Sequence, residues 1–241
     1  MKNEIWLAID TATEFASMAV GNAESAVLSR MVGARQHAAQ ILVVIEHVLE
    51  KAGVSLEHIT RIIVGDGPGS FTGLRIGWAA AKGLAHEREI PLVAIPSLLG
   101  AAAVGGGEAT TGPIAALYDA LRGQVFGAIY SFPAGRVETI VPPGLYSISE
   151  LARRAPVRPV AAVGDGIDQY GKEIIGWIGH PPVTLDKLAP IAGSFLMLAS
   201  RDGARRELLD PASAEPSYGR LAEAQVKWET RHGRPLPNSS R

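Results

Sequence analysis

The order of the expected strands and helices limits the fold of this chain more than any single residue does. Apolar runs bounded by turn residues predict strands, and apolar residues at helical spacing predict helices. The expected elements are strands at 5–10, 16–21 and 25–32, a helix at 37–52, a strand at 61–64, a helix at 74–85 and a strand at 92–95. This βββαβαβ order predicts an α/β unit with a mixed sheet.

The same order can be followed a second time along the chain. The second set comprises strands at 114–118, 125–131 and 137–141, a helix near 147–154, a strand at 160–163 and a helix near 169–178. We therefore expect two copies of one unit, at 1–105 and 113–214, joined by a glycine-rich stretch. A C-terminal segment at 215–230 and a disordered tail at 231–241 would follow them.

A glycine-rich run at 65–75 connects an expected strand to the next helix. Gly67 and Gly69 relieve the steric restrictions on the backbone, and Ser70 can cap the helix. The free N–H groups at the start of a helix can hold an anion. The spacing matches neither a Walker loop nor a dinucleotide fingerprint. Two readings stay open: an anion site, or a tight turn that lets the helix pack closely. Arg75, in the first turn, would pair with an acid such as Asp66, with an anion or with a partner's carboxylate.

Small residues recur at every fourth position of the helix after this run. They are Gly69, Gly73, Gly77, Ala81 and Ala85. A glycine inside a helix costs about 1 kcal/mol relative to alanine, so close approach of another backbone is the natural reason for the two interior ones. That backbone can belong to the chain's own sheet or to a partner helix.

Composition excludes several classes of protein. The 241 residues are 47% apolar, carry a formal net charge of −1 and include no cysteine, which excludes disulfides and thiolate zinc sites. No pair of the six histidines has metal-binding spacing, so we expect no metal site. The apolar core of residues 5–9 is too short for a signal peptide, and no stretch suits a membrane span. We expect a globular cytoplasmic protein.

Several segments of the sequence form a recognisable set. They are Ile9-Asp10-Thr11-Ala12-Thr13, His37, GPGSFTGLRIG at 67–77, Lys82-Gly83-Leu84-Ala85, Ile95-Pro96-Ser97-Leu98, DALRGQVF at 119–126 and Glu215-Pro216-Ser217-Tyr218 with Arg220. Together they resemble the TsaB family, also called YeaZ, within the actin-like ATPase superfamily of paired ribonuclease-H-like subdomains. The resemblance is strongest over residues 5–98. Leu121 departs from it, because the family usually has arginine there.

The resemblance implies a scaffold in a bacterial tRNA-modifying complex. TsaB proteins serve in making threonylcarbamoyladenosine (t6A) in tRNA, pair with the catalytic subunit TsaD, help recruit the ATPase TsaE and meet tRNA through the complex. Isolated members can form homodimers through the same surface. The resemblance implies no cofactor for the chain by itself, although ATP or ADP and Mg²⁺ can be present in the complex.

The two long helices of the first half form the partner contact in that family. The first helix buries a stripe that includes Ile41, Leu42, Ile45 and Val48, yet Val43 lies on its opposite face and Val44 widens the stripe. Apolar side chains outside the buried stripe favour an interface. We expect its residues to be His37, Gln40, Val43, Val44, His47, Gly73, Gly77, Trp78 and Ala81.

An actin-like ATP-binding protein with weak ATPase activity is the competing interpretation. Acids at the ends of the first strand of each half could hold Mg²⁺ and a nucleotide. The candidate nucleotide or anion site consists of Asp10, Thr11, Gly67, Gly69, Ser70, Arg75 and Asp119. Neither acid is followed by the glycine-rich turn that lets a backbone approach phosphates, so this site would be incomplete.

A glycoprotease-like peptidase is a further alternative, because the family was once grouped with metalloproteases. The related catalytic subunit uses a His-x-x-x-His pair on its first long helix. Here His37 is followed at that spacing by Ile41, so a metal site of that kind is not expected.

Overall fold

The computed structural model describes residues 4–32, 37–106, 111–208, 210–220 and 231–233. The strands are β1 (Ile5–Asp10), β2 (Phe15–Gly21), β3 (Ala26–Val32), β4 (Ile59–Gly65), β5 (Leu92–Ile95), β6 (Ile114–Asp119), β7 (Val125–Ser131), β8 (Glu138–Tyr146), β9 (Ala161–Val163) and β10 (Arg206–Glu207). The helices are α1 (His37–Ala52), α2 (Phe71–Arg88), α3 (Ser97–Gly106), α4 (Ile148–Arg154), α5 (Gly166–Ile178) and α6 (Ile191–Leu198). In these described residues no helix is both long and apolar enough to cross a membrane.

The first sheet has six strands in the order β10-β5-β4-β1-β2-β3. β1 pairs antiparallel with β2 and parallel with β4, so the expected meander and the βαβ crossover share one mixed sheet. Side chains alternate between its faces: Leu7 and Ile9 pack with α1 and α2, whereas Ala8 faces the opposite core. The sheet is therefore apolar on both faces and needs helices on both.

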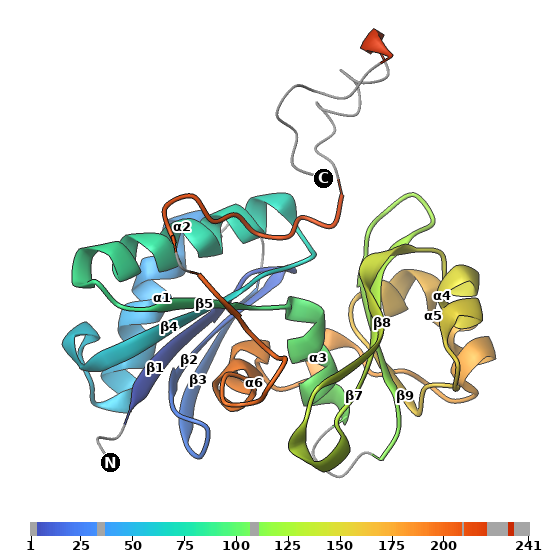
Figure 1. Cartoon of the computed structure of the whole chain (residues 1–241), viewed down its shortest axis with the longest axis horizontal. Coiled ribbons are helices and arrows are strands. Elements are labelled where there is room, and N and C mark those ends of the chain that lie inside the picture. The colour runs from blue at the N-terminus through green and yellow to red at the C-terminus, as the bar shows by residue number, and fades with distance from the viewer. Residues whose placement is uncertain (1–3, 33–36, 107–110, 209, 221–230, 234–241) are drawn as a thin grey trace.

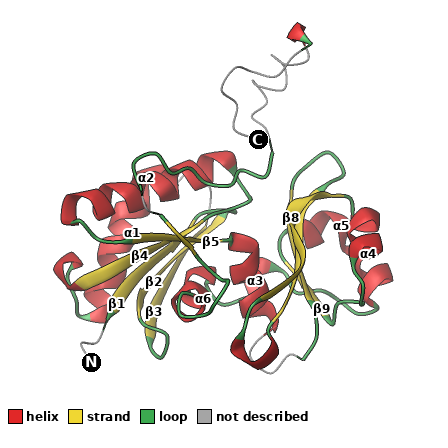
Figure 2. Ribbon diagram, in the orientation of Figure 1, coloured by secondary structure: helices red, strands yellow, loops and turns green. Residues whose placement is uncertain are grey.

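The second sheet has the order β8-β7-β6-β9 and is also mixed, because β9 runs parallel to β6. Helices α3 and α6 lie between the two sheets, and α4 and α5 cover the outer face of the second one (Figures 1 and 2). Gly100 brings α3 close to α6, because an added Cβ would overlap Phe195 and Ile191. The halves thus share one central core between the sheets.

The second half departs from the expected copy at its end. Its final strand, β10, pairs with β5 of the first sheet, and α6 packs against β1 and β2. The expected division at 113–214 therefore does not follow the packing, since 191–207 completes the first half. Helix α6 has the sequence IAGSFLML, and such a uniformly apolar helix is stable only where packing surrounds it.

Parts of the expected layout fall outside the described residues. The joint between the halves follows α3, and residues 107–110 within it are not described. The same holds for 221–230 and for most of the expected tail at 231–241.

The small-residue stripe of α2 faces the chain's own first hairpin. A Cβ at Gly69 would overlap the carbonyl of Ala12, and one at Gly73 would overlap that of Thr11. One at Gly77 would overlap the Thr11 side chain. The small-residue stripe therefore packs against the chain's own first sheet, which was one of the two alternatives, and not against a partner helix.

Two glycines of α2 provide a matched test of this packing. Gly73→Ala should destabilise the fold by roughly 1–3 kcal/mol, because the Thr11 carbonyl it would strike is backbone and cannot rotate away. Gly83→Ala, with nothing near its added methyl group, should stabilise it by about 0.5–1 kcal/mol through helix propensity. Urea unfolding measures the free energy of unfolding of each variant. Equal changes in the two variants would refute the close packing of Gly73 on Thr11.

Candidate functional site

The outer face of α1 carries apolar side chains that are exposed in the described part of the chain. Leu42 is 59% exposed and Val43 is 62% exposed. Gln40 and His47 lie exposed near them, and Val44 is half-buried. His37 begins the helix, but its side chain lies outside the described part. Leu42 was expected in the buried stripe; the helix is turned so that it faces outward.

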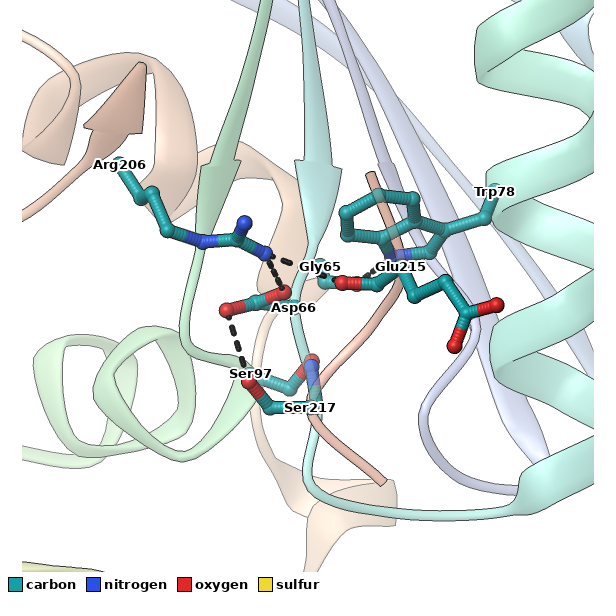
Figure 3. A network of polar contacts seen from close by, with 8 residues as sticks. Gly65, Asp66, Trp78, Ser97, Arg206, Glu215 and Ser217 are labelled. Carbon is teal, nitrogen blue, oxygen red and sulfur yellow. Dashed lines mark hydrogen bonds and ion pairs between the residues drawn. The ribbon is translucent and has the colours of Figure 1, made fainter. Parts of the chain in front are cut away.

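The four interface residues expected on α2 lie inside the chain instead. Gly73 and Gly77 pack on the first hairpin, and Ala81 is fully buried against α1 and the sheet. Trp78 is also buried, and its indole N–H donates to the Gly65 carbonyl over 3.0 Å (Figure 3). Small and apolar residues fit a buried helix face as well as an interface, so the sequence pattern does not distinguish the two.

A cavity of about 860 Å³ opens between the two halves. The first half contributes the tip of its first hairpin and the start of α2 to the cavity wall. The second half contributes the ends of β6 and β7, and the C-terminal segment forms a third wall. The lining residues are Ala12, Thr13, Glu14, Gly69, Ser70, Phe71, Arg75, Tyr118, Asp119, Ala120, Leu121, Phe126, Asp165, Tyr218 and Arg220. Its size is within the usual range for small-molecule sites.

Four of the seven predicted nucleotide-site residues line this cavity, namely Gly69, Ser70, Arg75 and Asp119. Ser70 is the N-cap of α2, since its hydroxyl accepts from the Gly73 N–H over 3.2 Å. Gly67 is buried under the carbonyl of Ser217 and the side chain of Leu74. Thr11 is buried beneath Gly73 and Gly77. The predicted site is therefore divided, and only its outer part is open to a ligand.

Asp10 is held inside the protein. Its carboxylate accepts a 2.6 Å hydrogen bond from the Ser97 hydroxyl, and it is fully buried. Burial raises the pKa of the Asp10 carboxyl from 3.8 to about 6, and the Ser97 hydrogen bond opposes that rise. The Ser70 N–H also donates to the Ala12 carbonyl, which closes the hairpin against the glycine-rich loop. The place where an acid would hold a nucleotide's metal ion is thus filled by protein.

The C-terminal segment supplies cavity residues that the candidate list missed. The Arg75 Nε donates to the Tyr218 hydroxyl over 3.2 Å, and Arg220 donates to the Ala120 carbonyl over 2.6 Å. In the sequence, Tyr218 and Arg220 stand out only as part of the resemblance to the TsaB family. Tyr218 lies 143 residues from Arg75 and Arg220 lies 100 residues from Ala120, so no local pattern could assign them to the cavity.

Asp66 fixes this segment to the first half. Its carboxylate accepts from Arg206 over 2.7 Å and from the Ser217 hydroxyl over 3.1 Å (Figure 3). Burial raises the pKa of Asp66, and the Arg206 hydrogen bond opposes that rise. Of the alternatives for Arg75, pairing with Asp66 is therefore wrong, because Asp66 binds Arg206 and Arg75 binds the Tyr218 hydroxyl.

Within the described residues, no three side chains of His, Cys, Asp or Glu come together as a group that could hold a metal ion.

Replacing Asp10 by Asn tests the buried carboxyl. Its folded pKa of about 6 exceeds the unfolded value of 3.8, so stability should fall as pH rises between them. At about 1.4 kcal/mol per pKa unit, the ionised group costs roughly 3 kcal/mol at neutral pH. Asp10→Asn keeps an oxygen for Ser97 and should flatten this part of the pH profile of urea unfolding. If the free energy of unfolding of Asp10→Asn and of the unaltered chain changed with pH in parallel, the burial of the Asp10 carboxylate would be contradicted.

Comparisons with known proteins identify relatives over most of the chain. The family model for TsaD, tRNA N6-adenosine threonylcarbamoyltransferase, matches residues 30–172. The tRNA threonylcarbamoyladenosine biosynthesis protein TsaB of Bacillus subtilis is 30% identical over 92% of this chain and 96% of its own length. The Escherichia coli TsaB protein is 37% identical over 52% of this chain and 54% of its length.

A solved structure agrees with these matches. YeaZ from Pseudomonas aeruginosa superposes with a TM-score of 0.74 at 28% identity, and the alignment covers 89% of this chain and 99% of that one. The chain therefore belongs to the TsaB (YeaZ) family of tRNA threonylcarbamoyladenosine biosynthesis proteins.

Proposed function

We propose that this chain is a non-catalytic scaffold subunit of the t6A-modifying complex and that it pairs with a TsaD-type catalytic subunit. The outer face of α1 carries the proposal. Leu42 and Val43 lie exposed one after the other in the middle of a helix whose opposite face is already buried. Two adjacent branched apolar side chains in water favour an interface, because their burial against a partner releases the water around them.

The kind of partner follows from the region shared with TsaD. The TsaD model matches residues 30–172, which include α1 and α2. Two chains with similar helices can pair by placing the same helix faces against each other around an approximate two-fold axis. A second copy of this chain could use the same face when the TsaD-type subunit is missing, which accounts for the expected homodimer.

The non-catalytic part of the proposal rests on the first hairpin. Asp10 is the acid that an actin-like ATPase would turn toward the nucleotide, and here it is buried against Ser97. The carbonyls of Thr11 and Ala12 lie directly against Gly73 and Gly69, so the start of α2 covers the backbone that follows Asp10. The alternative of an ATPase acting by itself therefore has little support in this geometry.

The remaining partners belong to the complex. We propose that the chain helps to recruit a TsaE-type ATPase and meets tRNA through the assembled complex in the cytoplasm. ATP or ADP and Mg²⁺ would then be bound by the assembly. These roles rest on membership of the TsaB family.

A charge on the outer face of α1 tests the pairing. Val43→Asp should weaken binding to the purified TsaD-type subunit more than about a hundredfold, because an ionised carboxylate would be buried without a partner. The fold should persist, since this side chain is exposed. Isothermal titration calorimetry measures the dissociation constant.

Val157→Asp is the matched control. Val157 is 60% exposed but lies in the loop between α4 and β9, in the other half. It should bind the TsaD-type subunit as the unaltered chain does. Unchanged affinity of Val43→Asp would reject the α1 interface.

A further inference from the structure

Residues 210–220, which we call the strap, pass from one half of the protein to the other. The strap follows β10 and runs along α2 toward the second half (Figure 1). It contains no helix or strand. Ordering an irregular backbone costs conformational entropy, so contacts with the rest of the chain must hold the strap in its path.

The first half holds the strap at Asp66. The Asp66 carboxylate accepts from the Ser217 hydroxyl over 3.1 Å, and the Asp66 carbonyl accepts from the Ser217 N–H over 2.8 Å. Arg206 donates to the same carboxylate over 2.7 Å and to the Glu215 carbonyl of the strap over 3.2 Å (Figure 3). Because Asp66 is buried, water competes little for these bonds. The strap is therefore bound to the first half through its backbone as well as its side chains.

The last two residues of the strap contact the second half. Arg220 donates to the Ala120 carbonyl over 2.6 Å, and its guanidinium lies 5.8 Å from the centroid of the Phe126 ring. Gly219 lies between Pro68 of the first half and Phe126 of the second, and an added Cβ would overlap both. Its backbone is left-handed, with φ 69°, which also favours glycine. The strap thus passes through a narrow space with one half on each side.

The two halves are therefore joined in two ways. The core that contains α3 and α6 joins them between the sheets. The strap joins them along the cavity, since Tyr218 and Arg220 both line it. Two bodies that touch on one side can rotate about that contact. A second connection across the cavity opposes such a rotation.

We propose that the strap fixes the angle between the two halves and thereby the width of the cavity. Asp66 holds the strap on the first half, and Arg220 and Gly219 hold the second half against it. When the contacts with the second half are lost, the halves rotate about the shared core while each keeps its own fold. This role is internal to the chain and requires no partner.

A distance measurement between the halves tests the strap. The sequence contains no cysteine, so Glu87→Cys on α2 and Glu173→Cys on α5 would carry the only two spin labels of the full chain. Both positions are exposed, and the two helices belong to different halves. Double electron–electron resonance gives the distribution of distances between the labels. The labelled chain without further changes should give one narrow distribution.

Two strap variants of the labelled chain should widen this distribution. Arg220→Ala removes the hydrogen bond to Ala120, and Gly219→Val forces the strap away from its contacts with both halves. In each variant we expect a broader distribution that extends to longer distances. Arg153→Ala, which replaces an exposed arginine on α4, is the matched control and should leave the distribution unchanged.

The same measurement separates a strap that fixes the angle from one that only adds stability. A strap that only adds stability would give a lower free energy of unfolding in urea with an unchanged distance distribution. That result in Arg220→Ala, with circular dichroism showing a folded chain, would overturn the proposal. Broadening in Arg220→Ala but not in the control would support it. If Gly219→Val does not fold, Arg220→Ala decides alone, because it removes one hydrogen bond of a half-buried side chain.

Discussion

The close packing of α2 on the first hairpin determines most of what this chain can do. Gly69 and Gly73 let the start of the helix lie directly on the carbonyls of Ala12 and Thr11, and the Ser70 N–H bonds to Ala12. Close contact of this kind requires positions without a Cβ, because interiors are packed to crystal density. The same contact fills the place where a nucleotide's phosphates would otherwise meet the hairpin. A loop that could have been a phosphate site is thus a structural joint.

Two surfaces remain after this packing, and they differ in chemistry. The outer face of α1 is apolar and convex, which suits another protein. The cavity between the halves is concave and is lined by aromatic rings together with two arginines and three acids. Asp66 holds the C-terminal segment, which reaches from the edge of the first sheet to the cavity.

Local patterns predicted the local elements well. Helix α1 and strand β5 have the expected bounds, because apolar periodicity and the Gly53 and Pro96 boundaries act within a few residues. Helix α6 was missed since its apolar sequence has no periodicity, and β10 pairs with a strand more than 100 residues away. Trp78 and Ala81 were assigned to a partner because burial within a chain and burial between chains require the same residue types. Arg220 lies at the cavity because of packing between segments far apart in the sequence, and the spacing of residues along the sequence does not predict such packing.

Reconstituted t6A synthesis tests the central claim, that this chain supports the reaction without catalysing a step. The mixture contains the TsaD-type subunit, the TsaE-type ATPase, unmodified tRNA and a threonylcarbamoyl donor, with no added chain, the unaltered chain or the Asp10→Asn variant. The account predicts that synthesis requires the chain and that Asp10→Asn supports it fully, since this acid is buried against Ser97. Loss of synthesis by a variant that still binds the TsaD-type subunit would make Asp10 catalytic and contradict the account.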